Sequence, residues 1–197
     1  MMTGLSVSVR EPGVRHGAQR GHRGRGPGGG VVRVSNPTGG EVATHVQASP
    51  DVVYGLVSDV RRMGEWSPET YWCEWTGGAT GAEVGARFRA CNRRGLLRWR
   101  NTPEVITATP GGEFSFRRRV AGNVVVWRYR MVVDRGGTRL SESYEVLTPT
   151  PAALNRVVLI MMGVRDRHAD LMNGMHLTLD RLRIAAEAAE VDGRPPW

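Results

Sequence analysis

The chain has 197 residues, 27 of them basic and 19 acidic, and it carries a formal net charge of +8 at pH 7. Its longest purely apolar run, residues 157–162, is far shorter than the roughly 20 residues that a membrane-spanning helix needs, which excludes a protein built from such helices. Residues 1–40 hold six arginines and one glutamate, so most of the excess charge lies on a short N-terminal segment. The net charge therefore does not by itself predict that the rest of the chain binds nucleic acid.

Residues 1–40 are predicted to form a disordered arm rich in glycine and arginine. Ten glycines fall within residues 10–40, and such a sequence has too few apolar side chains to offset the entropy cost of folding. An arginine–glycine arm can follow an RNA backbone, but this one contains no Phe, Tyr or Trp on which a base could stack. We therefore expect the arm to be a solvated tail that does not bind nucleic acid. The alternative is that the arm binds RNA.

The N-terminus and the cysteines indicate a cytoplasmic protein. Residues 1–9 lack the positive charge and the apolar core of a signal peptide. Cys73 and Cys91 have no metal-ligand spacing around them, so we expect reduced thiols and no bound metal. No cofactor motif is present in residues 41–182, because no glycine-rich turn opens a helix after a strand.

The predicted elements begin with a strand and two short helices, and six strands follow. Alternating apolar residues predict a strand over residues 41–47. Ser49 and Pro50 are typical of a helix start, and a shorter helical turn that ends at Pro68 comes next. Short turns with glycine separate the six predicted strands, at residues 70–76, 86–93, 96–109, 113–120, 124–134 and 138–147.

The last predicted element is a single helix over residues 152–190, with a C-terminal tail at 191–197. A curved antiparallel sheet needs a cover for its apolar face, and only this helix is long enough. The expected fold of residues 41–190 is therefore α+β, with a curved antiparallel sheet wrapped around a long C-terminal helix and two short helices after the first strand. A space between such a sheet and its helix is a favoured site for small molecules.

Four short segments resemble a known superfamily. They are Ser49-Pro-Asp-Val-Val-Tyr54, Met63-Gly-Glu-Trp-Ser-Pro68, Val84-Gly-Ala-Arg-Phe88 and Gly137-Thr-Arg-Leu-Ser-Glu-Ser-Tyr-Glu145. They are similar to helix starts, turns and strand starts of the START-like (SRPBCC) superfamily, which includes polyketide cyclases and aromatases, lipid-transfer proteins and Bet v 1-type proteins. The resemblance covers roughly residues 42–186 and implies the helix-grip fold. It does not choose between catalysts and carriers, because the superfamily contains both.

Strand alternation indicates which side chains face the expected cavity. The faces that carry aromatic residues also bring Asn92, Arg118 and Glu142 inward. A buried charge needs a partner or nearby water, so Arg118 and Glu142 form either a structural ion pair or a wet site that orients a ligand. In a cyclase-like reaction Arg118 would hold a carbonyl or enolate oxygen, and Glu142 or Tyr144 would move a proton.

Other inward-facing side chains are predicted to contact a ligand. His168 and the methionines of the last helix lie on its apolar stripe, where they serve either as core or as an adaptable wall for a hydrophobic molecule. The predicted ligand-binding residues are Phe88, Asn92, Phe116, Trp127, Tyr129, Met131, Met161, His168, Met172 and Met175.

Together these observations predict a cytoplasmic protein that binds a polyketide-like or lipid-like molecule. If the protein is an enzyme, the resemblance implies a polyketide cyclase or aromatase that needs no cofactor. A non-catalytic carrier of lipids or other hydrophobic molecules is the first alternative, and a module that binds a protein or RNA through the basic arm is the second. Arginine clusters at residues 61–62, 93–94 and 117–119 are expected to form a solvated face, because acidic residues elsewhere nearly balance them, and an anionic headgroup or an acyl-carrier protein is the alternative partner. A second copy of the chain is a further candidate partner.

Overall fold

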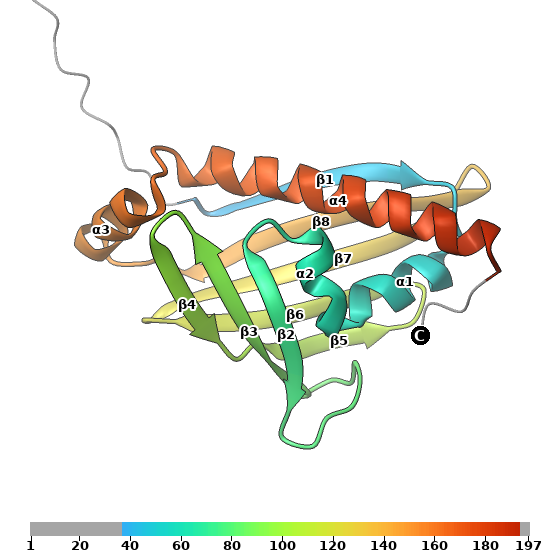
Figure 1. Cartoon of the computed structure of the whole chain (residues 1–197), viewed down its shortest axis with the longest axis horizontal. Helices are drawn as coiled ribbons and strands as arrows, with labels where there is room; N and C mark the ends of the chain where they lie inside the picture. Colours follow the sequence, from blue (N-terminus) through green and yellow to red (C-terminus); the bar gives the residue numbers. More distant parts are fainter. Residues whose placement is uncertain (1–36, 194–197) are drawn as a thin grey trace, which may run out of the picture. The chain divides into compact units, whose positions relative to one another are not determined.

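The computed structural model describes residues 37–193, which form one antiparallel sheet and its covering helices (Figure 1). The strands are β1 (Gly39–Val46), β2 (Thr70–Thr76), β3 (Arg87–Arg94), β4 (Leu97–Asn101), β5 (Glu104–Thr109), β6 (Glu113–Val120), β7 (Asn123–Asp134) and β8 (Gly137–Thr148). The helices are α1 (Pro50–Ser58), the 3-10 turn η1 (Val60–Arg62), α2 (Met63–Trp66), α3 (Ala152–Met162) and α4 (Arg167–Val191).

The strands follow the order β1-β8-β7-β6-β5-β3-β2, and β4 pairs with β3. Tight hairpins connect β5 to β8, so this part of the sheet is a meander. The turn between β7 and β8 places Arg135 and Gly136 at φ angles of 49° and 79°, and such left-handed pairs match the twist of a two-residue hairpin. The first strand pairs with the last one, with Val42 opposite Glu142, which places the start of the domain beside its final hairpin.

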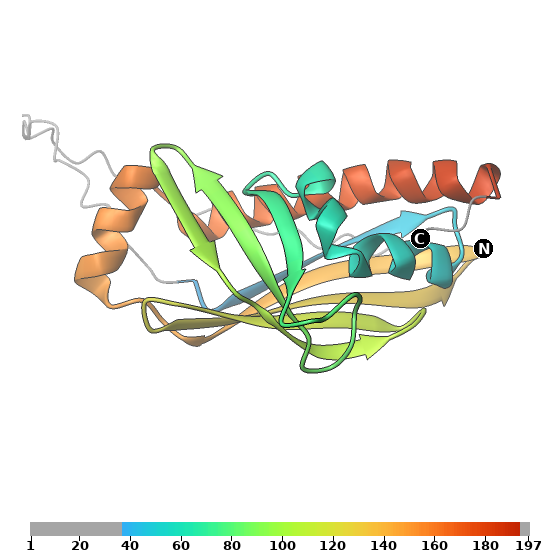
Figure 2. The same cartoon turned by 60° about the horizontal axis from the view of Figure 1, so that its bottom comes forward.

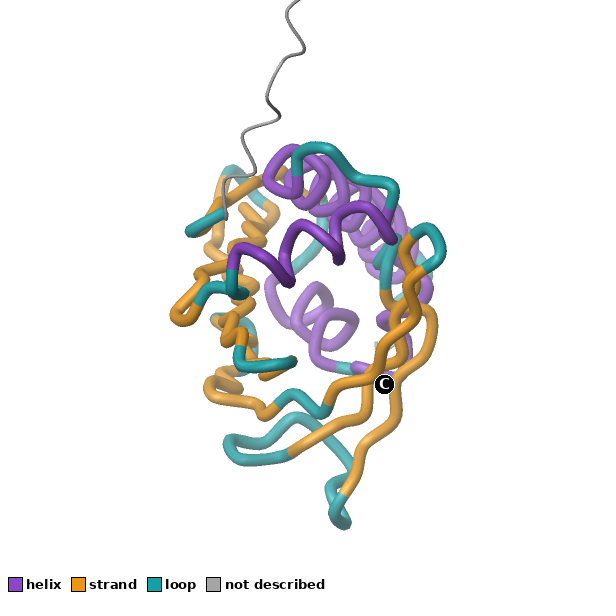
Figure 3. Tube along the Cα trace, turned by 90° about the vertical axis from the view of Figure 1, so that its left-hand side faces the viewer, coloured by secondary structure: helices purple, strands orange, loops and turns teal. Residues whose placement is uncertain are grey.

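Helix α4 and the short helix α1 cover the inner face of the sheet (Figure 2). Viewed from the end of the domain, the strands curve around both sides of the helices (Figure 3). Phe88, Phe114, Leu140, Leu179 and Leu182 are fully buried between these layers. The predicted α+β helix-grip fold is confirmed, because one apolar core joins the inner face of the curved sheet to α4 and to the short helices after β1.

The prediction of one helix over residues 152–190 is wrong, because two helices occupy this stretch. Helix α3 ends at Gly163, whose φ of 68° lies in the left-handed region. The backbone nitrogens of Gly163 and Val164 bond to the carbonyls of Ile160 and Leu159, at 3.0 Å each, which is the Schellman pattern that ends helices. Helix α4 then starts afresh at Asp166, whose carboxylate accepts a bond from the backbone nitrogen of Ala169.

The predicted strand at residues 96–109 is also two strands, β4 and β5. Pro103 lies between them and cannot donate a backbone hydrogen bond to a neighbouring strand. Strand β4 pairs with β3 over residues 97–101, whereas β5 touches β3 at one register position, Arg87 opposite Glu104, and then pairs with β6. The bend lets the β3–β4 hairpin extend away from the meander and toward α3 (Figure 1).

The start of the domain and the state of its two cysteines can be compared with the predictions from the sequence. Strand β1 begins at Gly39, so it includes the last two residues of the predicted arm. Residues 1–36 of the predicted arm and residues 194–197 of the predicted tail lie outside the described residues. Cys73 and Cys91 are buried free thiols on neighbouring strands. Within the described residues, none of the helices is both long and apolar enough to cross a membrane.

Candidate functional site

A cavity of about 200 Å³, here called cavity 1, lies between the inner face of the sheet and α4. Strands β3, β6, β7 and β8 supply one wall, because alternate side chains of each strand point to this face. Most of the wall is apolar, and a few polar groups converge on it, as in many small-molecule sites. The apolar and aromatic lining includes Met63, Phe88, Phe116, Trp127, Leu171 and Met175, and the polar lining includes Asn92, Arg118, Tyr129 and Glu142.

The carboxyl group of Glu142 is buried in the wall of cavity 1. Tyr129 lies opposite it on β7, and the Tyr129 hydroxyl donates a hydrogen bond of 2.9 Å to Oε1 of Glu142. The other oxygen, Oε2, has no hydrogen-bond partner among the described residues. Burial raises the pKa of Glu142 to about 8, although the bond from Tyr129 acts in the opposite direction. Near neutral pH this side chain is therefore mostly an uncharged acid with one unoccupied oxygen.

Arg118 enters cavity 1 from β6, on the same face as Phe114 and Phe116. It makes neither an ion pair nor a hydrogen bond with any residue of the 37–193 range. Burial, and then the nearby charge of Arg167, lower the pKa of Arg118 to about 10. The guanidinium group therefore stays protonated at pH 7. The ion pair with Glu142 that the sequence left open does not form, and both side chains face the cavity unpaired by charge.

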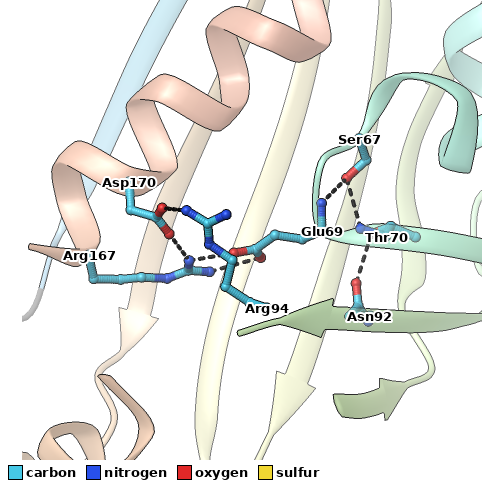
Figure 4. A network of polar contacts seen from close by, with 7 residues as sticks. All are labelled: Ser67, Glu69, Thr70, Asn92, Arg94, Arg167 and Asp170. Carbon is cyan, nitrogen blue, oxygen red and sulfur yellow. Dashed lines mark hydrogen bonds and ion pairs between the residues drawn. The ribbon is translucent and has the colours of Figure 1, made fainter. Parts of the chain in front are cut away.

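An ion-pair cluster, here called the Arg167 cluster, borders cavity 1 at the start of α4 (Figure 4). Arg167 binds both oxygens of Glu69, with a distance of 2.9 Å between Nη2 and Oε2. The same guanidinium lies 2.6 Å from Asp170, which also pairs with Arg94 of β3. The side chains of Arg167 and Asp170 are each only 12% exposed, so these pairs are largely removed from water. The cluster ties α4 to the strands across the cavity from it.

Neutral hydrogen bonds extend from this cluster along β2 and β3 (Figure 4). The Thr70 hydroxyl donates to Oδ1 of Asn92 at 2.7 Å, and the Asn92 amide donates to the carbonyl of Ala90 at 3.3 Å. The hydroxyl of Ser67 accepts from the backbone nitrogen of Thr70 at 3.0 Å. Asn92 therefore faces cavity 1 with one hydrogen bond at each end of its amide, which fixes its orientation and leaves one N–H and one lone pair for a ligand.

A second cavity of about 260 Å³, cavity 2, lies beside cavity 1 and beneath α3. Its apolar wall includes Val158, Leu159 and Met162 of that helix. Tyr144 of β8 also lines it, and the Tyr144 hydroxyl shares a hydrogen bond of 2.8 Å with Nδ1 of the exposed His168. The two cavities are separated by side chains that line both, namely Trp99, Arg118, Trp127, Arg167 and Leu171.

The structure brings most of the predicted site residues to these two cavities. Cavity 1 is lined by Phe88, Asn92, Phe116, Arg118, Trp127, Tyr129, Glu142 and Met175, and cavity 2 by Arg118, Trp127 and Tyr144. Met131 is buried in the core, and Met172 packs against that core beside Gly40. Met161 points to solvent, because the helix break at Gly163 changes the faces that a continuous helix would present. His168 is exposed and lines neither cavity, but its ring lies against Tyr144 and bonds to the Tyr144 hydroxyl at the edge of cavity 2.

Sequence reasoning missed Arg167, Asp170 and Glu69, which all line cavity 1. The available signal was Asp166, a helix-capping residue that places Arg167 and Asp170 in the first turn of α4. The pairing with Glu69 is set by the fold, since the two residues are far apart in the chain. Among the described residues, no three His, Cys, Asp or Glu side chains gather in a way that could hold a metal ion.

Comparison with protein families identifies the chain. The family model described as polyketide cyclase / dehydrase and lipid transport matches residues 37–176. The chain belongs to this family. Membership confirms the superfamily that the sequence motifs resemble, and it supports a fold that binds hydrophobic ligands. A comparison with curated protein sequences found no match.

Solved structures share the fold at low sequence identity. Protein CV1439 from Chromobacterium violaceum is 15% identical, with a TM-score of 0.57 over 77% of this chain and 99% of that chain. Major latex-like protein 151 from Panax ginseng is 11% identical, with a TM-score of 0.56 over 76% and 99%. The di-domain aromatase/cyclase StfQ of the steffimycin biosynthetic pathway is 14% identical, with a TM-score of 0.61 over 77% of this chain and 51% of StfQ. The chain therefore spans about half of StfQ, and these likenesses show the fold alone.

Proposed function

We propose that this domain binds a hydrophobic, ketone-bearing molecule in cavity 1 and catalyses proton transfer on it, as a polyketide cyclase or dehydratase does. The observation that carries the proposal is Glu142, a buried carboxyl group with one free oxygen in an apolar wall that also holds the unpaired Arg118. A passive carrier has no need for either group, and burying them without partners costs free energy. Such an arrangement is more usual at a reaction centre than in a structural core.

Arg118 is suited to hold the substrate's carbonyl oxygen. Its protonated guanidinium group faces cavity 1 with unused donors. Removing a proton from the carbon beside a ketone places negative charge on that oxygen. A fixed cation in a largely dry cavity stabilises this enolate more than it stabilises the neutral ketone, which lowers the barrier.

Glu142 is suited to move the proton. With a pKa of about 8, a minority of the molecules carry the carboxylate at pH 7 and the majority carry the acid. The carboxylate takes a proton from the α-carbon of a β-hydroxy ketone and becomes the acid. The acid then returns that proton to the β-hydroxyl group, which leaves as water while the carbon–carbon double bond forms. Tyr144 is less suited to this role, because its hydroxyl lies at cavity 2 and is bonded to His168.

The experiment uses a small aryl β-hydroxy ketone, whose dehydration to a conjugated enone is followed by absorbance. We expect Glu142→Gln to lose about 100-fold or more in rate and to keep its affinity for the probe. Glu145→Gln is the matched control, because Glu145 is an exposed carboxylate on the outer face of the same strand. If the probe binds to the wild type and is never converted, or if Glu142→Gln converts it at the full rate, the catalytic proposal fails and the carrier alternative takes its place.

The natural ligand can be sought independently of the probe. Native mass spectrometry of the protein purified from its own host would reveal a co-purified hydrophobic molecule. We expect a ligand that carries several carbonyl or phenol oxygens, since those groups match Arg118 and Glu142. A simple fatty acid or phospholipid as the main bound species would support the carrier alternative.

A further inference from the structure

Helix α3 exposes apolar side chains on the face that points away from cavity 2. Ile160 and Val157 are 73% and 53% exposed, and Met161 beside them is 41% exposed. Leu154, 40% exposed, lies at the edge of this face and also lines cavity 2. Leu96, at the tip of the β3–β4 turn, is 88% exposed. These five residues are here called the α3 patch. Clustered exposure of long aliphatic side chains on a folded domain marks an interaction surface rather than ordinary surface scatter.

The α3 patch is one continuous surface, although it comes from two segments far apart in the chain. The backbone nitrogen of Leu96 donates a hydrogen bond of 3.0 Å to the carbonyl of Met161. A Cβ atom on Gly95 would lie 2.5 Å from the carbonyl oxygen of Met162, so the turn packs tightly against the end of α3. The hairpin tip and the helix are therefore presented together at the same end of the domain (Figure 1).

The two segments that carry the α3 patch are rich in arginine, and the exposed Asp166 is the first acidic residue after the second of them. Residues 93–98 and 152–165 contain five arginines and no acidic residue. Four of these arginines are exposed, namely Arg93, Arg98, Arg156 and Arg165. The described domain also starts at this end, because Pro37 lines cavity 2.

We propose that the α3 patch binds the surface of a membrane that contains anionic lipids. A bilayer interface matches both parts of the surface at once, because it offers an apolar boundary to Leu96, Val157 and Ile160 and negative headgroups to the arginines around them. A second copy of the chain matches it poorly. A symmetric dimer would place the same patch on both sides and bring arginines against arginines.

Membrane binding through α3 also explains the position of cavity 2. The inner side of α3 forms the wall of this cavity, so a hydrophobic molecule in the bilayer is separated from the cavity by one helix. The idea that a ligand passes between the bilayer and cavity 2 at this helix rests on the proposed function. The binding of the α3 patch to lipid does not rest on it. The two are distinguished by measuring vesicle binding without any ligand.

The test is sedimentation of the full chain with sucrose-loaded vesicles. One set is phosphatidylcholine alone, and the other contains one quarter phosphatidylglycerol. We expect more protein to bind to the anionic vesicles and the bound fraction to fall as salt is raised, because the arginine contacts are screened. Equal binding to both sets, or no binding to either, would overturn the proposal and turn attention to an acidic protein partner.

A matched pair of variants separates the patch from the rest of the surface. Ile160→Asp should weaken binding to anionic vesicles about tenfold or more, since it removes an inserted side chain and adds a repelled charge. Ile184→Asp, at a 61% exposed isoleucine on α4, should change binding little, and both variants should keep the wild-type circular dichroism. Equal binding by the two variants would show that the basic N-terminal segment acts alone. If the wild type is a dimer in the absence of vesicles and Ile160→Asp makes it monomeric, the patch binds a second copy instead. Either of these two results contradicts the proposal.

Discussion

Tyr129 and Glu142 face each other across β7 and β8, and the tyrosine hydroxyl donates a 2.9 Å hydrogen bond to one carboxyl oxygen of the glutamate. This bond and the unpartnered second oxygen define the chemistry of cavity 1. Hydrogen bonding alone would lower the pKa of Glu142, yet burial outweighs it and raises that pKa to about 8. The site therefore keeps an acid uncharged close to neutral pH, at a cost in stability that can be measured.

The first prediction concerns the free energy of unfolding of the Glu142→Gln variant. The unfolded chain releases the Glu142 proton near pH 4.5, whereas the folded chain holds it until about pH 8. Between these values the folded state binds more protons, so wild-type stability falls as the pH rises through this window. Each unit of pKa corresponds to about 1.4 kcal/mol, which makes the total effect several kcal/mol.

Glutamine cannot ionise, so the variant lacks this pH dependence. In urea unfolding from pH 5 to pH 9, the free energy of unfolding of the variant should rise relative to that of the wild type up to about pH 8. Above pH 8 the difference between the two should stay constant. Glu145→Gln, on the exposed face of β8, is the control and should track the wild type. A constant difference between Glu142→Gln and the wild type across the range would mean that Glu142 is already ionised in the folded protein.

The second prediction tests the Arg167 cluster. Glu69→Gln removes one carboxylate from a guanidinium group that is only 12% exposed, and Arg167 keeps Asp170 as its remaining partner. We expect a loss of about 1–3 kcal/mol in the free energy of unfolding, because a charged hydrogen bond is lost where water cannot fully replace it. Urea titration at constant pH measures this loss.

The control for the cluster is an exposed pair of the same kind. Glu74 pairs with Arg89 at 2.7 Å on the outer face of the sheet, with side chains 42% and 51% exposed. Glu74→Gln should cost less than about 1 kcal/mol, and raising the salt concentration should shrink that cost further. Equal losses for the two variants would mean that the Arg167 cluster is solvated and does not hold α4 to the strands.

The faces of the strands can be predicted from the sequence, because side-chain direction in a strand has a period of two residues. Leu140, Glu142 and Tyr144 alternate with polar neighbours, and this pattern alone predicts that Glu142 lies on the inner face of β8, as it does. The same rule predicts the faces of Phe114, Phe116 and Arg118 correctly. Alternation cannot supply the partner of each charge, since it says nothing of how far apart two strands bring their side chains.

The missed features depend on contacts between distant parts of the chain or on competing local signals. Arg167 binds Glu69 across 98 positions of sequence, and no local pattern specifies such a pair. The end of α3 has a local signal in Gly163 and Asp166, but apolar residues continue at helical spacing on both sides of it and favour one long helix. The exposed position of Met161 follows from that break, so one misplaced helix end also misplaces a ligand-binding candidate.

The third prediction concerns the thiol of Cys73. Burial raises the pKa of Cys73 to about 12, so only a very small fraction of the thiol is ionised at pH 8. Its reaction with Ellman's reagent in the folded protein should be about a thousandfold slower than in the unfolded chain. A Cys91→Ala variant leaves Cys73 as the one thiol and makes the measurement specific. Rapid labelling of this variant without denaturant would show that the core around Cys73 opens readily.

The last prediction tests the helix break itself. Gly163 has a φ of 68°, and a Cβ atom there would meet nothing within 4 Å, so Gly163→Ala adds backbone strain and no steric clash. We expect a loss of about 1 kcal/mol in the free energy of unfolding, measured by urea titration. Gly81→Ala is the matched control, because Gly81 also has open space around it but no left-handed φ, and it should be neutral or slightly stabilising. If Gly163→Ala were instead stabilising, α3 and α4 would join into the single helix that the apolar spacing favours, and the α3 patch would lose its present orientation.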